Sequence, residues 1–238
     1  MAQEKVWDRE YKKSTFLTKE NKPQSDVVRF VKWLKENSPE LCEGFITNKA
    51  IVTTVLDLGC GTGRNSYYFA ELGADVTGIE ISKTALDIAK ANLNIDGNQI
   101  YAIAYIKQSI GEKLPFEDES FDILLDVTSS NSLSESERDI YLFETNRVLK
   151  HGGYFFTKAL CKEGDENAKT LLKKSPGKGK DTYIMPDTNI EERVWSKNDF
   201  VKTYEKYFKI ISLDKKTSYT RMNDRVYKRN FWIAYLQK

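Results

Sequence analysis

The stretch Val55-Leu-Asp-Leu-Gly-Cys-Gly-Thr-Gly-Arg-Asn-Ser66 decides the fold. It lies where a β-favouring run over residues 51–58 meets a predicted helix over residues 64–72. Its three glycines lack a Cβ, so the backbone can turn tightly and approach a ligand closely. Ligands of open α/β sheets bind beyond the carboxyl ends of the strands. The stretch therefore predicts a ligand site at this turn.

Strand and helix patterns alternate on both sides of this turn. Strands are predicted at 75–81, 100–107, 121–127 and 154–160, and helices at 24–37, from Ser82 to about residue 97, and at 135–149. Ser82 is a predicted helix cap, and Ser134 with Glu137 forms a predicted capping box. This alternation predicts an α/β fold of the Rossmann-like kind, a mostly parallel sheet with helices on both faces. The expected core includes Val28, Ile140 and Phe143.

The chain is expected to form one domain in four parts. Residues 1–48 form an N-terminal arm and helix, and residues 49–161 form the core that binds a cofactor. Residues 162–195 are a polar, lysine-rich insertion that is expected to act as a lid or to recognise the substrate. Residues 196–238 supply a last helix, at 196–208, and two strands, at 209–217 and 226–237.

Composition narrows the class of protein. The 238 residues are 40% hydrophobic and 30% charged, which excludes a disordered chain or a coiled coil. Three scattered cysteines predict neither a disulfide framework nor a metal site. No apolar leader and no run near the ~20 residues of a membrane span is visible. We therefore expect a soluble, cytoplasmic protein with no membrane partner.

The net charge of +2 is unevenly distributed. Residues 1–157 hold 18 Lys and Arg against 24 Asp and Glu, a net charge of −6, and residues 158–238 hold 19 against 11, a net charge of +8. The last third could thus meet an anionic partner, or its lysines could simply keep the surface soluble.

The turn favours one of two ligand classes. Glu80 follows Gly59 by 21 residues and can accept hydrogen bonds from ribose hydroxyls. A dinucleotide motif G-x-G-x-x-G requires glycine where Arg64 stands. Asp57 adds an acid that a pyrophosphate would not need but an ammonium group would. The residues therefore favour S-adenosylmethionine over a nicotinamide or flavin dinucleotide.

Here the sequence resembles the class I S-adenosylmethionine-dependent methyltransferases. Residues 57–63 look like their first motif, and further similar pieces follow in order: Glu80, Leu114-Pro-Phe116, Ser120-Phe-Asp122 and Arg147-Val-Leu-Lys-His-Gly-Gly153. The resemblance covers roughly residues 50–160. It implies a seven-stranded sheet with the last strand antiparallel, and S-adenosylhomocysteine as product.

The resemblance also implies roles for individual residues. Asp57, Gly59, Gly61 and Gly63 would hold the amino-acid end of the cofactor, Glu80 the ribose, and Ile81 the adenine. Ser109 and Ile110 stand where the family often has an acid that faces the adenine amine. The expected cofactor set is completed by Tyr11, Cys60, Thr62, Asn65 and Asp126.

A narrower likeness concerns small-molecule enzymes of this family. Gly63-Arg-Asn-Ser66 and the segment Asn223 to Leu236 are similar to tellurite-resistance methyltransferases. Trp7-Asp8-x-x-Tyr11 is similar to the arm that closes over the cofactor there and in thiopurine methyltransferases. The stretch 126–133 departs from both groups, so the likeness does not name the acceptor.

Methyl transfer from a sulfonium is an in-line displacement that needs donor and acceptor aligned at about 3–3.5 Å. Asp126, at the end of the fourth strand, is the candidate catalytic base or acceptor-orienting group, or else a strand cap or cofactor contact. The only histidine, His151, is expected at the opposite end of the sheet. Candidate substrate contacts are Trp7, Tyr183, Arg221 and Arg225, and the arginines would suit an anionic small molecule.

Three functions stay open at this point. The first is a methyltransferase for a small molecule. The second is a methyltransferase for RNA or protein, which the basic last third favours, so that nucleic acid stays among the possible partners. The third is a protein that binds S-adenosylmethionine without catalysis, because fold does not fix function.

Overall fold

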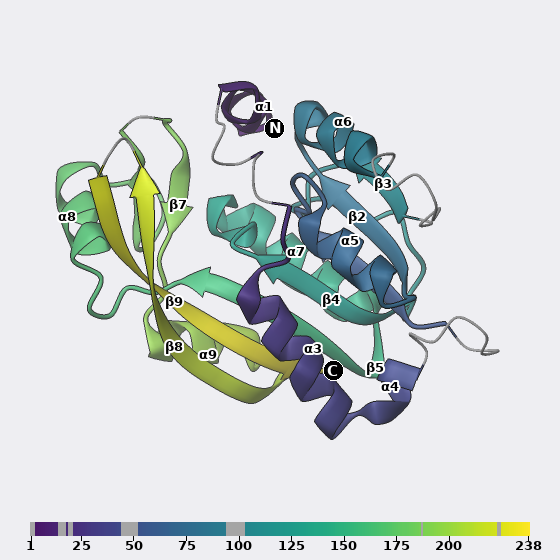
Figure 1. Cartoon of the computed structure of the whole chain (residues 1–238). Helices are drawn as coiled ribbons and strands as arrows, with labels where there is room; N and C mark the ends of the chain where they lie inside the picture. Colours follow the sequence, from purple (N-terminus) through teal and green to yellow (C-terminus); the bar gives the residue numbers. More distant parts are fainter. Residues whose placement is uncertain are drawn as a thin grey trace.

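The computed structural model describes residues 3–13, 18, 21–43, 52–93, 103–186, 188–222 and 225–238 (Figure 1). Of residues 220–222 and 225–227 it describes the backbone alone. Among the described helices, none is long and apolar enough to cross a bilayer.

A seven-stranded sheet forms the centre of the molecule. Its strands stand in the order β3-β2-β1-β4-β5-β9-β8. The first five are parallel, and β9 runs antiparallel to both β5 and β8. This is the expected sheet, including its one reversed strand. The strands are β1 (Thr54–Leu58), β2 (Asp75–Glu80), β3 (Ile103–Lys107), β4 (Phe121–Val127), β5 (Leu149–Leu160), β8 (Lys209–Met222) and β9 (Arg225–Gln237).

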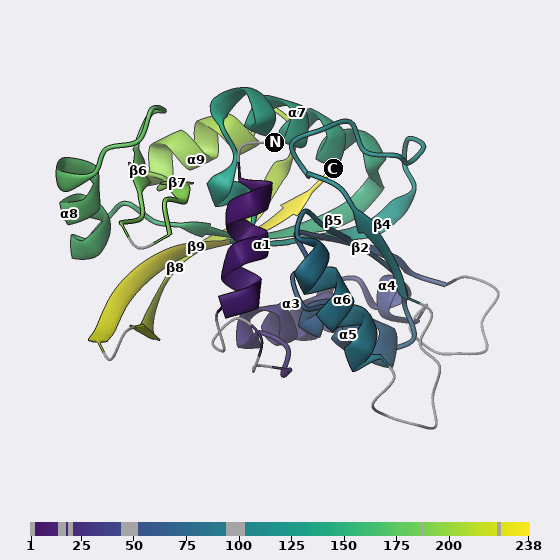
Figure 2. The same cartoon turned by 90° about the horizontal axis from the view of Figure 1, so that it is seen from above.

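Helices cover both faces of the sheet, as Figure 2 shows from above. One face carries α3 (Ser25–Asn37), α4 (Pro39–Glu43), α5 (Arg64–Glu71) and α6 (Lys83–Asn92), and the other carries α7 (Glu135–Val148) and α9 (Lys197–Tyr204). A separate apolar cluster lies on each side: Phe30 and Phe69 belong to the first, Tyr141 and Phe200 to the second. β1 and β4 contribute side chains to both, because alternate residues of a strand face opposite sides.

Both predicted helix caps are confirmed. The Ser82 hydroxyl accepts a hydrogen bond from the Ala85 amide, and Ser134 and Glu137 form the complete capping box of α7. Three expected core residues are instead exposed: Val28 by 38%, Ile140 by 43% and Phe143 by 58%. Val148 and Leu149, also expected in the core, are wholly buried, and the buried face of α7 carries Tyr141 and Leu142 where Ile140 and Phe143 were expected.

The insertion forms its own secondary structure beside the outer half of β8 and β9 (Figure 1). It contains α8 (Glu166–Lys174) and a two-stranded sheet of β6 (Thr182–Ile184) and β7 (Glu191–Arg193). Buried Asp165 attaches it: the carboxylate caps α8 through the Ala168 amide and accepts from the Asn230 amide of β9, each at 2.8 Å. The insertion is therefore packed structure.

The first helix, α1 (Glu4–Lys13), crosses above the carboxyl ends of the parallel strands (Figure 2). None of its described residues is fully buried, and polar contacts hold it in place. The Asp8 carboxylate accepts from the Ser82 hydroxyl at 3.0 Å and the Thr84 amide at 2.9 Å at the start of α6. At its other side, the Arg9 guanidinium donates to the Thr188 carbonyl at 2.7 Å. The helix thus bridges the sheet and the insertion.

Candidate active site

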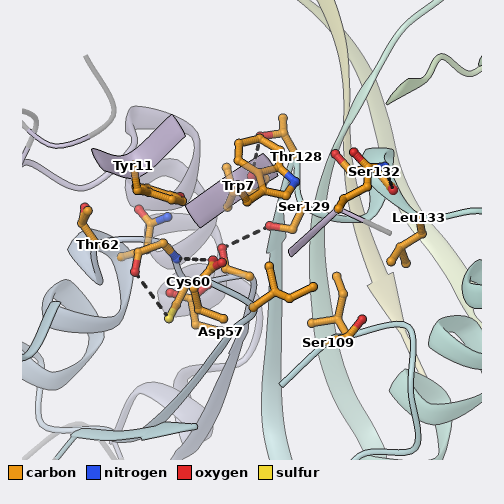
Figure 3. A pocket seen from close by; sticks show the side chains of 18 of the residues that line it. Trp7, Tyr11, Asp57, Cys60, Thr62, Ser109, Thr128, Ser129, Ser132 and Leu133 are labelled. Atoms are coloured by element: carbon orange, nitrogen blue, oxygen red, sulfur yellow. Dashed lines mark hydrogen bonds between the residues drawn. The ribbon is translucent and has the colours of Figure 1, made fainter. Parts of the chain in front are cut away.

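A cavity of about 590 Å³ lies between α1 and the carboxyl ends of β1, β2 and β4 (Figure 3). This volume is in the range of small-molecule sites. The expected site residues that line it are Trp7, Tyr11, Asp57, Gly59, Cys60, Gly61, Thr62, Asn65, Glu80, Ile81, Ser109 and Ile110. The fold therefore brings residues that are far apart in the sequence together around one cavity.

The glycine turn shapes the floor of the cavity. Gly59 has φ +72°, a left-handed conformation that L side chains rarely adopt. A Cβ on Gly59 would lie 2.3 Å from the Ser129 hydroxyl oxygen. That hydroxyl instead donates to the Gly59 carbonyl at 3.1 Å. Glycine is required here because the exits of β1 and β4 touch.

Two buried acids stand beside this turn. The Asp57 carboxylate accepts from the Ser66 hydroxyl at 2.6 Å, and burial raises its pKa to about 6. The Glu80 carboxylate accepts from the Gly61 amide at 3.0 Å and the Ser82 amide at 2.8 Å, and burial raises its pKa as well. Two carboxylates in a buried wall suit a ligand that brings a positive charge and hydroxyl donors.

The opposite wall is less polar. Ile81 and Ile110 line it, and the Ser109 hydroxyl accepts from the Gly111 amide at 3.2 Å. Gln108 also lines the cavity at this side and its side-chain amide donates to the Lys113 carbonyl at 2.6 Å. An apolar slot with few polar groups fits a heterocyclic base.

Two aromatic side chains of α1 close the cavity from above. The Trp7 and Tyr11 rings lie 6.2 Å apart, and Figure 3 shows both over the glycine turn. A Cβ on Gly61 would lie 2.7 Å from the Tyr11 hydroxyl oxygen, so this glycine too leaves room for its neighbour. Burial raises the pKa of Tyr11 well above its usual value, so the ring stays a neutral cover.

Asp126 lies under the cavity wall and does not line the cavity. Its side chain is wholly buried, and one carboxylate oxygen accepts from the Ser129 amide at 2.8 Å and the Ser130 amide at 3.3 Å. The other oxygen accepts from the Tyr141 hydroxyl at 2.7 Å. Burial raises the pKa of Asp126. This geometry is that of a strand-end cap that holds the loop after β4.

That loop supplies the part of the cavity that the sequence interpretation missed. Thr128 has φ +67°, a strained conformation for a β-branched residue. Thr128 follows β4 directly, and this position could have indicated from the sequence that it lines the cavity. The lining residues that were not predicted are Gln3, Gln24, Arg64, Gln108, Val127, Thr128, Ser129, Ser132, Leu133 and Glu137.

The remaining predicted residues lie elsewhere. Gly63 precedes α5 with φ +80° and does not line the cavity. Tyr183 was a predicted substrate contact, but its side chain is buried and its hydroxyl bonds Glu192 and Arg229. It lies in the core because the insertion folds around it. The side chains of Arg221 and Arg225 lie outside the described residues.

Comparisons with known proteins agree with this geometry. Residues 56–157 match the model of a methyltransferase domain. The fatty-acid O-methyltransferase of Mycolicibacterium smegmatis is 34% identical over 103 residues, which cover 42% of this chain and 35% of that protein. Across the first curated relatives, the matched segment spans 35–46% of their length.

Solved structures share the fold along nearly the whole chain. The 1,6-didemethyltoxoflavin-N1-methyltransferase of Burkholderia thailandensis, with bound 1,6-didemethyltoxoflavin and S-adenosylhomocysteine, has a TM-score of 0.68 at 14% identity. That similarity covers 99% of this chain and 86% of the other. TehB of Haemophilus influenzae has a TM-score of 0.58 at 16% identity, over 87% of this chain and 66% of TehB. With its glycine turn, its acids and its sheet order, the segment 56–157 matches a methyltransferase domain, within a fold that solved S-adenosylmethionine-dependent methyltransferases share.

Proposed function

We propose that this protein transfers a methyl group from S-adenosylmethionine to a small-molecule acceptor, with S-adenosylhomocysteine as product. One observation carries the proposal: a single cavity joins the acids of the glycine turn to the loop after β4, under the aromatic side chains of α1. The first end suits a cationic nucleoside, and the second end leaves room for an acceptor.

The chain's residues fit this cofactor. Asp57 would face its ammonium group, Glu80 its ribose hydroxyls, and Ile81 with Ile110 its adenine. Trp7 and Tyr11 would cover it and exclude water, and aromatic faces tolerate a nearby cation. When bound, S-adenosylmethionine supplies an electrophilic methyl group on a sulfonium.

The acceptor end favours a group that is already nucleophilic. Thr128, Ser129 and Ser132 present hydroxyls there, and the lining residues of the described chain include neither lysine nor histidine. His151 lies near the start of β5, whereas the cavity lies at the carboxyl ends of the parallel strands. Its side chain is exposed, and its Nε2 lies 3.1 Å from a carboxylate oxygen of Glu119. A thiolate or a metalloid would need no strong base, so the protein's task would be alignment and exclusion of water.

The relatives support a small acceptor but not one acceptor atom. One carries fatty-acid O-methyltransferase as its name, and the structural neighbour from Burkholderia methylates a nitrogen. The acceptor class therefore has to come from this chain's own cavity.

A macromolecular acceptor is the second candidate, and the charge of +8 in residues 158–238 favours it. However, several lysines of this region are paired within the chain: Lys162 with Asp181, Lys180 with Asp199 and Lys216 with Asp26. Paired lysines contribute less to a phosphate-binding surface. Binding of tRNA that weakens steeply with salt would favour this second function.

The first test is calorimetric titration with S-adenosylhomocysteine, with NAD as the control ligand. We expect saturable binding of the first alone. Glu80→Ala should weaken it by roughly 1–3 kcal/mol, because hydrogen bonds to a charged group are lost. Absence of binding to the folded wild-type protein would contradict the proposal. A panel of thiols, metalloid oxyanions and small aromatic acids then tests for turnover, and binding without any product would favour a non-catalytic role.

A further inference from the structure

Two buried arginines lie against one tryptophan behind the wall of the cavity. The guanidinium carbon of Arg193 lies 3.9 Å from the centre of the Trp195 ring, and that of Arg138 lies 5.4 Å from it. Arg138 is 3% exposed, Arg193 7% and Trp195 1%. We call these three residues the arginine–tryptophan cluster. It joins the start of α7 to β7 and to the segment between β7 and α9.

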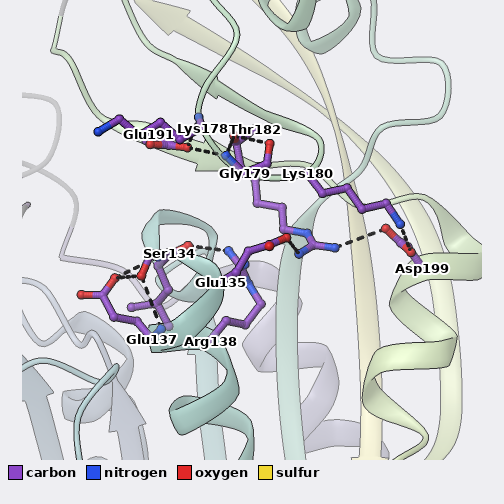
Figure 4. A network of polar contacts seen from close by, with 12 residues as sticks. Ser134, Glu135, Glu137, Arg138, Lys178, Gly179, Lys180, Thr182, Glu191 and Asp199 are labelled. Carbon is purple, nitrogen blue, oxygen red and sulfur yellow. Dashed lines mark hydrogen bonds and ion pairs between the residues drawn. The ribbon is translucent and has the colours of Figure 1, made fainter.

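The two arginines differ in their partners. Arg193 pairs with Glu135 at 3.4 Å and Asp199 at 3.2 Å, and Asp199 also pairs with Lys180 at 2.7 Å (Figure 4). Among the described residues, no carboxylate lies within 4.0 Å of the Arg138 guanidinium. Its Nη2 donates to the Leu133 carbonyl at 2.6 Å. With Lys180, three positive charges of this region face the two carboxylates of Glu135 and Asp199, which leaves one positive charge in excess.

Several donors of the cluster are also unused. Arg138 Nε and Nη1, Arg193 Nε and Trp195 Nε1 are buried with no hydrogen-bond partner among the described residues. Burial of an unpaired guanidinium is strongly unfavourable. Burial and the neighbouring Arg193 lower the pKa of Arg138 to about 10, so it still carries its proton at neutral pH. Every unused group here is a donor, which calls for an anion.

The cluster adjoins the acceptor end of the cavity. Leu133, whose carbonyl Arg138 binds, lines that cavity together with Ser132. The Ser132 hydroxyl is itself buried with no partner among the described residues. Gln3 of the N-terminal segment donates to the carbonyls of Ser132 and Glu191, and so ties this wall to β7. Arg138 does not line the cavity itself, so a carboxylate that enters from the cavity reaches its guanidinium past Ser132 and Leu133.

We propose that the arginine–tryptophan cluster binds a carboxylate of the acceptor molecule, with Arg138 as the principal charge and the Ser132 hydroxyl as a further donor. This rests on the proposed function, because it assigns a chemical class, a small carboxylic acid, to the acceptor of that reaction. A monoanion matches the single unbalanced charge, and planar guanidinium groups suit planar carboxylates.

The test compares thermal unfolding and tryptophan fluorescence in sodium benzoate, sodium acetate and sodium chloride at equal ionic strength, with S-adenosylhomocysteine present. The carboxylates should raise the midpoint of the wild-type protein above that in chloride and change its fluorescence. In Arg138→Met the benzoate concentration for half the effect should rise at least tenfold, while the midpoint without benzoate stays equal or rises, because an unpaired buried charge is gone.

A matched control lies on the same helix. Arg147 is paired with Glu144 at 2.7 Å and Asp118 at 2.9 Å. Arg147→Met should lower the midpoint and leave the half-effect concentration of benzoate unchanged. Trp195→Phe keeps an aromatic ring and should remove the fluorescence change while the thermal response remains.

An equal response to chloride and carboxylates, or an unchanged half-effect concentration in Arg138→Met, would overturn the proposal. If Arg138→Met does not fold, Arg138→Lys decides. An ammonium cannot reproduce the planar donors, so a half-effect concentration within threefold of wild type would contradict the proposal, and a larger increase supports it. Titration of S-adenosylhomocysteine alone separates the two hypotheses: binding without a carboxylate response contradicts only the carboxylate site, and the reverse contradicts only the proposed function.

Discussion

At the scale of single residues, Asp57 makes the site sensitive to pH. Its pKa is about 6 in the folded protein, above the ordinary value of 3.8, because burial disfavours the charged form. The folded state thus holds the proton more tightly than the unfolded state. This group therefore opposes folding above pH 6 and ceases to do so as pH falls below about 4.

Cofactor affinity should follow the opposite course. The ionised Asp57 attracts an ammonium group, so the affinity for S-adenosylhomocysteine should fall by up to about tenfold per pH unit below pH 6. Calorimetric titrations between pH 5 and 8 measure this. Asp57→Asn should bind weakly at every pH, with a flat profile. A wild-type affinity that is constant across this range would show that Asp57 does not face the ligand's charge.

We infer that Asp126 affects the reaction by holding the loop after β4 in place. Asp126→Ala and Asp126→Asn should therefore differ in their effect on stability. Asp126→Ala leaves the Ser129 and Ser130 amides without their acceptor and should destabilise the fold by about 1–3 kcal/mol. Asp126→Asn keeps an acceptor and should keep cofactor affinity, with slower turnover because the loop shifts.

Urea unfolding and titration with S-adenosylhomocysteine give both quantities. Tyr141→Phe serves as the partner in a double-mutant cycle, since its hydroxyl donates to Asp126. Purely additive effects on stability would contradict a linked pair, and undiminished turnover of Asp126→Asn would remove Asp126 from any role in the reaction.

At the scale of elements, α1 is the component that should separate binding from folding. None of its described residues is fully buried, so deletion of residues 1–13 should change the thermal midpoint little. The same deletion removes Trp7, Tyr11 and Gln3 from the cavity and should weaken binding of S-adenosylhomocysteine at least tenfold. Calorimetry of both proteins measures this, and unaltered affinity would exclude α1 from the site.

Elements with local signals were predictable, and elements with distant partners were not. The glycine turn, both serine caps and the alternation of strands and helices depend on neighbours in the sequence. The strands β6 and β7 have three residues each, too few for a periodic pattern, so the insertion read as irregular. Ile140 and Phe143 were placed in the core because they are apolar, yet α7 turns Tyr141 and Leu142 inward.

At the scale of the whole molecule, the insertion depends on one buried carboxylate. Asp165 accepts from the Asn230 amide and pairs with Arg229 at 3.3 Å. Asp165→Ala should lower the free energy of unfolding by about 3–5 kcal/mol, because the largely buried Arg229 guanidinium loses the carboxylate that pairs with it.

Hydrogen exchange should locate that loss. Protection should fall between residues 166 and 193, while β1 to β5 keep theirs. Lys162→Ala, which removes the 42%-exposed partner of Asp181, is the control and should change protection little. Uniform loss across the sheet in Asp165→Ala would mean that the insertion and the sheet unfold as one unit.

More of the cavity lining was predicted beside the glycine turn, where we propose the cofactor, than beside the loop after β4, where we propose the acceptor. Asp57, Glu80 and the glycines are spaced within one strand–turn–helix unit, and that spacing is visible in the sequence. The acceptor end combines Gln3, the loop after β4 and the neighbourhood of β7, which only the fold brings together. Tyr183 was predicted as a substrate contact because it is an aromatic residue of the insertion, but its side chain is buried in the core.

The contacts of α1 have a consequence for the order in which the protein is made. α1 is synthesised before its partners Ser82 and Thr188, and before the Ser132 and Glu191 carbonyls that Gln3 binds. The full set of contacts can form only when residue 191 exists, about ten seconds or more after the synthesis of α1 at typical rates. The nascent protein therefore carries an open ligand site until the insertion has been synthesised.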